Sequence, residues 1–314
     1  MSRVILSIVG VIFLNACGTV PINLTEEIMQ LPDQPQWEKI AEKLDFPEGP
    51  VWDGSHTLFV SSCYGHRVNQ ISHMSGKVKI WSQPDSMSQW SHTNGLAFGP
   101  DKRLYACEFE HGRIIRFDAN GEAEIVLDGF NGTRFIRPND ITFDKWGNGY
   151  FTDSGHYRRE NPDGRVYRLA AGSDRATIAA DHLAFANGLA FSLNGATLYV
   201  AESARQVITQ FTVSQIGELS DPETFAVMEG GDPDGMAVDT SGNLWVAHFG
   251  AGKILIFGAD GTRLGEIVTP GKKPSNLAFG GADLKCLYLT EDETNAVYRL
   301  NLPFTGAALP FVGF

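Results

Sequence analysis

The feature that most constrains the fold of this chain is a five-residue motif that recurs along it. Two identical copies, NGLAF, begin at Asn94 and at Asn187. The related copies are EGPVW from Glu48, NDITF from Asn139, DGMAV from Asp234 and SNLAF from Ser275. Successive copies begin 41 to 48 residues apart. A near-constant period of this length is typical of repeat architectures.

Each copy is followed by the same series of local patterns. A turn rich in Gly, Asp or Asn, such as GPDKR or DTSGN, precedes a short aromatic and aliphatic run such as LYACE or LWVAH, and a third run such as KILIF follows. Short apolar or alternating runs between turn residues predict strands and leave no room for long helices. About four strands per repeat, in six repeats, predict an all-β fold, a six-bladed β-propeller. A linear solenoid is the alternative, but it usually needs atypical end repeats, which are not seen here.

Composition and charge narrow the class of partner. The 314 residues are 43% hydrophobic and include 34 glycines, as expected of a soluble, turn-rich globular protein. The 37 acidic and 25 basic residues give a formal net charge of -12. This charge repels phosphate backbones and anionic lipid headgroups, and no Lys/Arg run offsets it locally. Nucleic acid is therefore not expected as a partner.

The N-terminal segment has the pattern of an export signal. Arg3 supplies one positive charge before the apolar residues 4–14, a run too short to span a bilayer. The following Leu-Asn-Ala-Cys resembles a bacterial lipobox, in which Cys17 is lipidated, although Asn is unusual there. Ordinary secretion and a buried N-terminus are the alternatives. We therefore expect a signal in residues 1–17, a tether in 18–40 and a propeller hydrolase domain in 41–314. The expected location is the bacterial cell envelope, lipid-anchored or periplasmic, or outside the cell, with the lipid at Cys17 as the only membrane contact.

The other cysteines carry little functional information. Cys63, Cys107 and Cys286 are an odd number for an oxidising compartment, and their spacings fit no zinc motif. Small buried strand residues are the favoured interpretation. A single disulfide among the three is left open.

The first position of the repeated motif predicts a metal site. In a propeller the first strand of each blade lines the central channel, so these six residues are expected in one ring. All six carry a side-chain oxygen: Glu48, Asn94, Asn139, Asn187, Asp234 and Ser275. Buried carboxylates at short range destabilise each other unless a cation lies between them. We therefore expect one divalent cation held in the central channel by Glu48, Asp234 and two or more amide oxygens. Oxygen ligands suit Ca²⁺, Mg²⁺ or Mn²⁺ better than Zn²⁺, which is not excluded. A ring of polar side chains bonded to water is the alternative.

A second polar ring is expected where the second strands end. Its members are Ser62, Glu108, Asp153, Glu202, His248 and Glu291. Neighbouring strands are antiparallel, so these ends lie at the same face as the metal site. Such groups orient metal ligands in many proteins, although solvated loop residues are an equal alternative, and His248 is more often structural than a base.

Several segments resemble one family. FPEGPVW, RPND, ANGLAFS and DPDGMAVDTSGNLWVA resemble the senescence marker protein, gluconolactonase and luciferin-regenerating enzyme family, over residues 46–300. Members are six-bladed propellers that hydrolyse lactones with a channel-bound metal. The resemblance implies four metal ligands, which are Glu48, Asn139, Asn187 and Asp234. It also implies Asp234 as general base and Arg137 as a contact of sugar hydroxyls. The chain departs from related gluconolactonases in residues 154–163, which are expected to form a loop over the channel mouth, so the substrate is left open.

These observations predict metal-dependent hydrolysis of a lactone, with sugar lactones, opened to aldonic acids, as the first expectation. The cation, most simply Ca²⁺, would polarise the carbonyl while Asp234 accepts a proton from water. Asp140 is the alternative base, but successive strand residues point to opposite faces. Asn94 would form a hydrogen bond with the substrate or with a metal-bound water, or would have only a structural role in a turn. No nucleophile elbow, GxGxxG, P-loop or HExxH motif occurs. A phosphotriesterase-type hydrolase and a non-catalytic ligand-binding propeller are the other two hypotheses.

Overall fold

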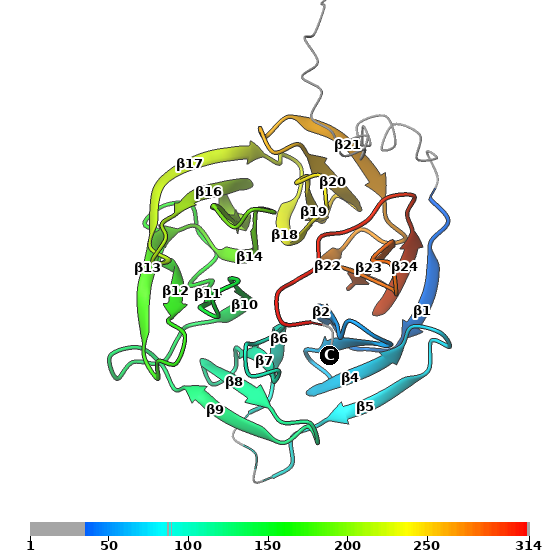
Figure 1. Ribbon diagram of the computed structural model, residues 1–314, viewed down its shortest axis with the longest axis horizontal. Helices are drawn as coiled ribbons and strands as arrows, with labels where there is room; N and C mark the ends of the chain where they lie inside the picture. Colours follow the sequence, from blue (N-terminus) through cyan, green and yellow to red (C-terminus); the bar gives the residue numbers. More distant parts are fainter. Residues whose placement is uncertain (1–34, 87, 89, 313–314) are drawn as a thin grey trace, which may run out of the picture.

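The computed structural model describes residues 35–86, 88 and 90–312, which form six four-stranded antiparallel sheets arranged around a central channel (Figure 1). The predicted six-bladed β-propeller is confirmed. The predicted signal in residues 1–17, with Cys17, lies outside the described residues, as does most of the tether. Within the described ranges, no helix has the length and apolar character needed to cross a membrane.

Five blades are built from four consecutive strands each. They are β2 (Pro47–Trp52), β3 (Thr57–Ser62), β4 (Arg67–Ser72) and β5 (Val78–Ser82); β6 (Thr93–Phe98), β7 (Leu104–Glu108), β8 (Arg113–Phe117) and β9 (Ala123–Leu127); β10 (Pro138–Phe143), β11 (Gly149–Asp153), β12 (Gly164–Leu169) and β13 (Ala176–Leu183); β14 (Ala186–Phe191), β15 (Thr197–Glu202), β16 (Val207–Val213) and β17 (Leu219–Val227); and β18 (Asp232–Val238), β19 (Leu244–Phe249), β20 (Lys253–Phe257) and β21 (Arg263–Val268). One turn of 3-10 helix, η1 (Ser203–Arg205), follows β15.

The sixth blade joins the two ends of the described chain. It contains β22 (Pro274–Gly280), β23 (Cys286–Glu291) and β24 (Ala296–Asn301), with β1 (Glu38–Glu42) as its outer strand. Arg299 pairs with Glu38 in the strand register, and its guanidinium donates to the Glu38 carboxylate at 2.8 Å. Residues 38–40, expected at the end of the tether, therefore belong to the propeller and close its ring.

The repeated motif forms the inner wall of the channel. The inner strands β2, β6, β10, β14, β18 and β22 each contact the next one around the axis, and β22 returns to β2 (Figure 1). They approach so closely that a Cβ atom added to Gly95 would lie 2.2 Å from Asp140 Oδ1. One added to Gly235 would lie 2.1 Å from the Asn276 side chain. The glycine that follows the first motif residue in most copies is thus required by packing.

Apolar side chains fill the spaces between neighbouring blades. The bulkiest are fully buried and include Trp245, Tyr150, Tyr288, Phe117 and Phe151. The turn residues predicted between strands also have a visible role, because Asp239 Oδ1 accepts from the backbone N–H groups of Ser241 and Asn243. Cys63, Cys107 and Cys286 are buried and free, so no disulfide joins any two of these three.

Candidate functional site

A cavity of about 460 Å³ opens at the end of the channel where the inner strands begin. Five of the six ring residues line it, namely Glu48, Asn94, Asn139, Asn187 and Asp234. Ser275 is the exception. It is buried, and its hydroxyl forms hydrogen bonds with the Pro47 carbonyl oxygen and the Thr290 hydroxyl, both at 2.9 Å. Blade six therefore places no first-position side chain in the cavity.

Glu48 and Asp234 bring two buried carboxyl groups to this cavity, exposed by only 4% and 9%. Burial is the main reason that the pKa of Glu48 is raised to about 8, and the Asp140 charge adds to it. Burial and the Glu48 charge also raise the pKa of Asp234 well above its usual range. Glu48 Oε2 accepts from the Gly49 backbone N–H at 3.1 Å, whereas no hydrogen bond reaches the Asp234 carboxylate within the described residues. A cation between the two groups would relieve their repulsion.

The amide of Asn187 is held in one orientation. Its Nδ2 donates to Ser203 Oγ at 3.1 Å, and that hydroxyl donates to the Pro233 carbonyl oxygen at 2.8 Å. Because the nitrogen is engaged with Ser203, the Asn187 amide oxygen is the atom left to bind a ligand. The wall also holds the Asn139 and Asn94 amides.

This set of donors fits a hard divalent cation. Carboxylate and amide oxygens are the ligands preferred by Ca²⁺, and Mg²⁺ and Mn²⁺ also favour oxygen. Among residues 35–86, 88 and 90–312, no group of three or more His, Cys, Asp and Glu side chains is arranged to hold a metal. A cation in this cavity would therefore depend on amide oxygens as well as on Glu48 and Asp234.

The residues of the predicted second ring lie behind the cavity wall. All six are buried, and none lines the cavity. The four acidic members accept hydrogen bonds from backbone N–H groups of the segment that leads into the inner strand of the same blade. Glu108 accepts from the Ser91 N–H, Asp153 from Arg137, Glu202 from Ala184 and Glu291 from Lys273, at 3.2, 2.7, 2.7 and 2.8 Å.

His248, in the same ring, does not line the cavity. Its Nε2 donates to the Met228 carbonyl oxygen at 3.1 Å, and burial lowers its pKa. Its prediction as a structural residue fits this position better than its alternative role as a base.

The side chain one residue further along the chain faces the cavity instead. At this position the cavity is lined by Cys63, Phe109, Ser154, Ser203 and Phe249. A shift of one residue in a strand moves a side chain to the opposite face, which explains why the sequence analysis missed these residues.

Asp292 occupies the corresponding place in blade six. It is buried, and among the described residues no donor meets either of its carboxylate oxygens in hydrogen-bonding geometry, although the Ser275 side chain lies close enough to lower its pKa slightly. Burial, followed by the charge of Glu48, raises its pKa to about 10. It adds a third acidic group close to Glu48 and Asp234. In the sequence, its position directly after β23 is the only sign that it belongs to the site.

Comparisons with known proteins identify a family that covers most of the chain. The family described as SMP-30/Gluconolactonase/LRE-like region matches residues 46–292. The chain belongs to this family. A lactonase drp35 of Staphylococcus haemolyticus is 30% identical over 267 residues, which are 81% of this chain and 79% of that protein. A 6-deoxy-6-sulfogluconolactonase of Pseudomonas putida is 28% identical over 253 residues, 79% and 84% of the two chains.

Solved structures agree with the family assignment. A gluconolactonase from Xanthomonas campestris superimposes with a TM-score of 0.75 at 32% identity, over 86% of this chain and 90% of that one. A calcium-binding regucalcin of Agrobacterium tumefaciens shares the fold, with a TM-score of 0.71 at 20% identity, over 90% and 96% of the two chains.

The mouth of this SMP-30/gluconolactonase-like propeller is lined by aromatic side chains and Arg137. Residues 154–163 reach across it, as predicted. The Tyr157 hydroxyl donates to Asp232 at 2.9 Å, and its ring packs against Phe185 with a centroid distance of 5.2 Å. Arg159 donates to the Ala204 carbonyl oxygen at 2.8 Å. The loop from blade three is thus fixed to blades four and five.

The alternative base, Asp140, does not line this cavity. Its Oδ1 accepts from the Ile141 N–H at 2.9 Å, and burial raises its pKa to about 7. Its side chain lines a separate cavity at the other end of the channel, as expected from the alternation of side chains along a strand.

Proposed function

We propose that this protein is a metal-dependent hydrolase that opens lactone rings, with sugar lactones giving aldonic acids as its first substrate class. The observation that carries the proposal is the pair of buried carboxyl groups, Glu48 and Asp234, in one cavity beside the oriented amide of Asn187. Membership of a family whose relatives are named lactonase and gluconolactonase supports the reaction class.

Glu48, Asn139, Asn187 and Asp234 would hold one divalent cation, with Ca²⁺ as the first choice. The oxygen-only set of donors supports this choice. A bound cation supplies Lewis acidity, which polarises an ester carbonyl and stabilises the charge that develops on its oxygen.

The protein's own residues would perform the remaining tasks. Asp234 would accept a proton from the attacking water as the water oxygen bonds to the carbonyl carbon, and the ring C–O bond would then break as its oxygen takes up a proton. Arg137 and Asn94, both on the cavity wall, would hold substrate hydroxyl groups. Asp140 is less suited to act as base because it lines the other cavity.

The test measures hydrolysis of a panel of aldonolactones, with paraoxon alongside, by protein lacking residues 1–17. The protein is stripped with a chelator and reloaded with Ca²⁺, Mn²⁺, Mg²⁺ or Zn²⁺. We expect lactone opening that disappears on chelation and returns with one of the metals, and Glu48→Gln should fail to recover it. Preference for paraoxon would instead identify a phosphotriesterase, and no turnover by metal-loaded protein would identify a binding propeller.

A separate proposal concerns location. We propose that residues 1–17 direct export and that Cys17 carries the lipid anchor, because of the apolar run and the lipobox-like end. Metabolic labelling with a radioactive fatty acid should mark the native chain and not the Cys17→Ala variant. Equal labelling of both would contradict the anchor.

A further inference from the structure

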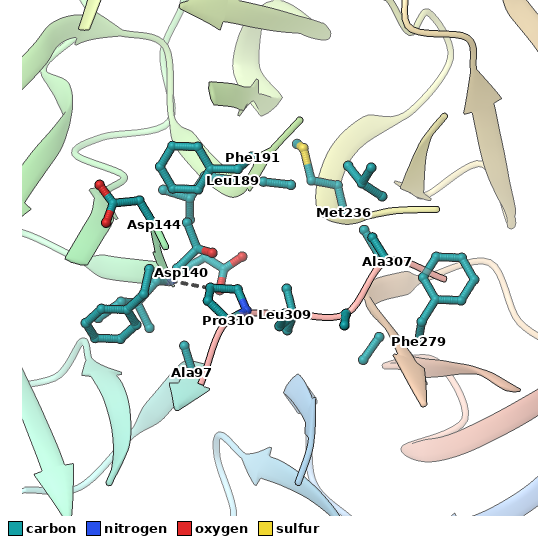
Figure 2. A pocket seen from close by; sticks show the side chains of 18 of the residues that line it. Ala97, Asp140, Asp144, Leu189, Phe191, Met236, Phe279, Ala307, Leu309 and Pro310 are labelled. Carbon is teal, nitrogen blue, oxygen red and sulfur yellow. Dashed lines mark hydrogen bonds between the residues drawn. The ribbon is translucent and has the colours of Figure 1, made fainter. Parts of the chain in front are cut away.

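The channel contains a second cavity, of about 650 Å³, at the end opposite the candidate active site. It is lined by residues further along the inner strands, including Leu189 and Phe191 of β14, Met236 of β18 and Phe279 of β22 (Figure 2). These walls are mostly apolar and come from several blades, although Asp144, Lys145, Ser192 and Asn194 also line the cavity. Nothing in the proposed lactonase reaction uses this cavity.

The C-terminal tail crosses this end of the channel. Ala307 donates to the Val238 carbonyl oxygen at 2.9 Å, and the Phe311 ring packs against Phe143 with a centroid distance of 6.4 Å. The tail thus runs from blade five to blade three across the channel (Figure 1). Residues 307–310 form one wall of the cavity (Figure 2). The tail narrows the opening and gives the cavity a side that the inner strands do not supply.

Three large apolar side chains are exposed around the opening. Trp146, Leu193 and Leu309 line the cavity and are 51%, 53% and 48% exposed. Single exposed apolar residues are common, but a group of them at the rim of an apolar cavity is typical of a ligand-binding site. A ligand that enters between these three side chains would bury their exposed apolar surface.

The floor of the cavity is polar. It contains Asp140 and Asn276, each less than a tenth exposed, at the motif position where the other four blades have glycine. Asp140 Oδ1 accepts from the Ile141 N–H at 2.9 Å, and Asn276 Oδ1 accepts from the Leu277 N–H at 2.7 Å. The Leu189 N–H and the Asn276 side chain also hydrogen-bond to the Asp140 carboxylate, so of its roughly four acceptor sites about one is left for a further donor.

We propose that this cavity binds a small amphiphile, an apolar chain or ring system with one hydroxyl or N–H group that donates to Asp140. The volume lies within the roughly 300 to 1,000 Å³ of sites for small ligands. The mostly apolar walls favour an apolar chain or ring over a polyol. The buried floor favours a ligand with a hydrogen-bond donor, because Asp140 desolvated by a purely apolar ligand would lose hydrogen bonds to water. A flat macromolecular surface would cover the rim and leave the floor unfilled.

The binding test uses N-phenyl-1-naphthylamine, a neutral apolar probe with one N–H donor that fluoresces strongly in apolar surroundings. Protein lacking residues 1–17 should increase the fluorescence of the probe with a saturable, micromolar dissociation constant. The double variant Leu193→Asp with Leu309→Asp should weaken binding at least tenfold. Ile216→Asp is the matched control, since Ile216 is 67% exposed and lies outside the cavity, and it should bind as the native protein does. No saturable signal, or equal loss in the control, would overturn the proposal.

The floor is tested by competition. 1-Octanol should displace the probe at least tenfold more effectively than octyl methyl ether, which has the same chain but no donor. Equal displacement by the two compounds would refute the role of the floor. Because both assays measure binding at the end away from the candidate active site, their outcome is independent of whether the protein hydrolyses lactones.

Discussion

The Asp153 carboxylate accepts a hydrogen bond from the backbone N–H of Arg137 at 2.7 Å. Its other oxygen accepts from the Ile136 N–H at 2.9 Å. Asp153 is buried at the end of β11, whereas Arg137 is exposed at the cavity mouth, two residues before Asn139. A side chain behind the cavity wall therefore fixes the backbone of a predicted substrate contact. Substrate binding should then depend on a residue that cannot touch the substrate.

Asp153→Asn tests this dependence. The amide keeps the volume but loses an acceptor for one of the two N–H groups, so we expect KM to rise several-fold with a smaller change in kcat. The lost hydrogen bond, worth about 1 kcal/mol, should lower Tm by about 2 to 4 °C. Glu291→Gln is the matched control, because Glu291 holds the Lys273 N–H in blade six, where the first motif residue does not line the cavity. An equal rise of KM in both variants would show a general loss of stability rather than positioning of Arg137.

Asp234→Asn should abolish lactone turnover and leave the fold intact. Removal of a general base typically costs about 10² to 10⁴ in rate, and this variant also removes a predicted ligand of the cation. Circular dichroism should match the native protein, and Tm without metal should be no lower, because the change removes a buried acidic group that is destabilised by Glu48. Asp140→Asn should keep kcat within about tenfold. Full activity of Asp234→Asn, with loss in Asp140→Asn, would reverse the two assignments.

The stability of metal-free protein should decrease as pH rises. The pKa of Glu48 is raised from 4.5 to about 8, chiefly by burial, so the folded chain holds a proton that the unfolded chain releases above about pH 4.5. The resulting stabilisation is complete below that pH and is lost as pH rises through about 8. Differential scanning fluorimetry with a chelator should show Tm falling over this range. Glu48→Gln should flatten the curve, and added Ca²⁺ should oppose the fall by stabilising ionised carboxylates. Identical curves for native and Glu48→Gln protein would contradict this origin.

The propeller could be predicted because its information is local and repeated. Each motif copy fixes one inner strand, and the alternation of side chains along a strand then brings residues as distant as Glu48 and Asp234 to one cavity. The same rule separates Asp140 from Asn139. Five of the six ring residues predicted from the period and the face of a strand therefore line the cavity, and Ser275 does not.

Features set by long-range packing were missed. The pairing of β1 with β24 joins strands some 260 positions apart, and nothing in the local pattern of residues 38–42 names a partner. The same holds for the tail at residues 307–310, which lacks strand periodicity. The alignment of the second strands identified residues behind the cavity wall and not those on it, because the choice between Asp153 and Ser154 depends on where each strand leaves the sheet. Motif copies also could not show that Ser275 is tied to the Pro47 carbonyl oxygen.

Tyr157 should control how tightly the mouth holds its substrate. Its hydroxyl ties the loop of residues 154–163 to Asp232, while its ring lines the cavity and packs against Phe185. Tyr157→Phe removes only the hydrogen bond, so KM should rise about two- to fivefold, consistent with about 0.5 to 1 kcal/mol. Tyr157→Ala also removes the ring that lines the mouth, so it should raise KM further and reduce discrimination between small and large lactones. Steady-state kinetics on a size series of lactones measures both effects. Arg159 holds the loop independently through the Ala204 carbonyl oxygen, so Tm should change little in either variant. If Tyr157→Ala left KM and the size preference of the native enzyme intact, the loop would cover the mouth without selecting the substrate.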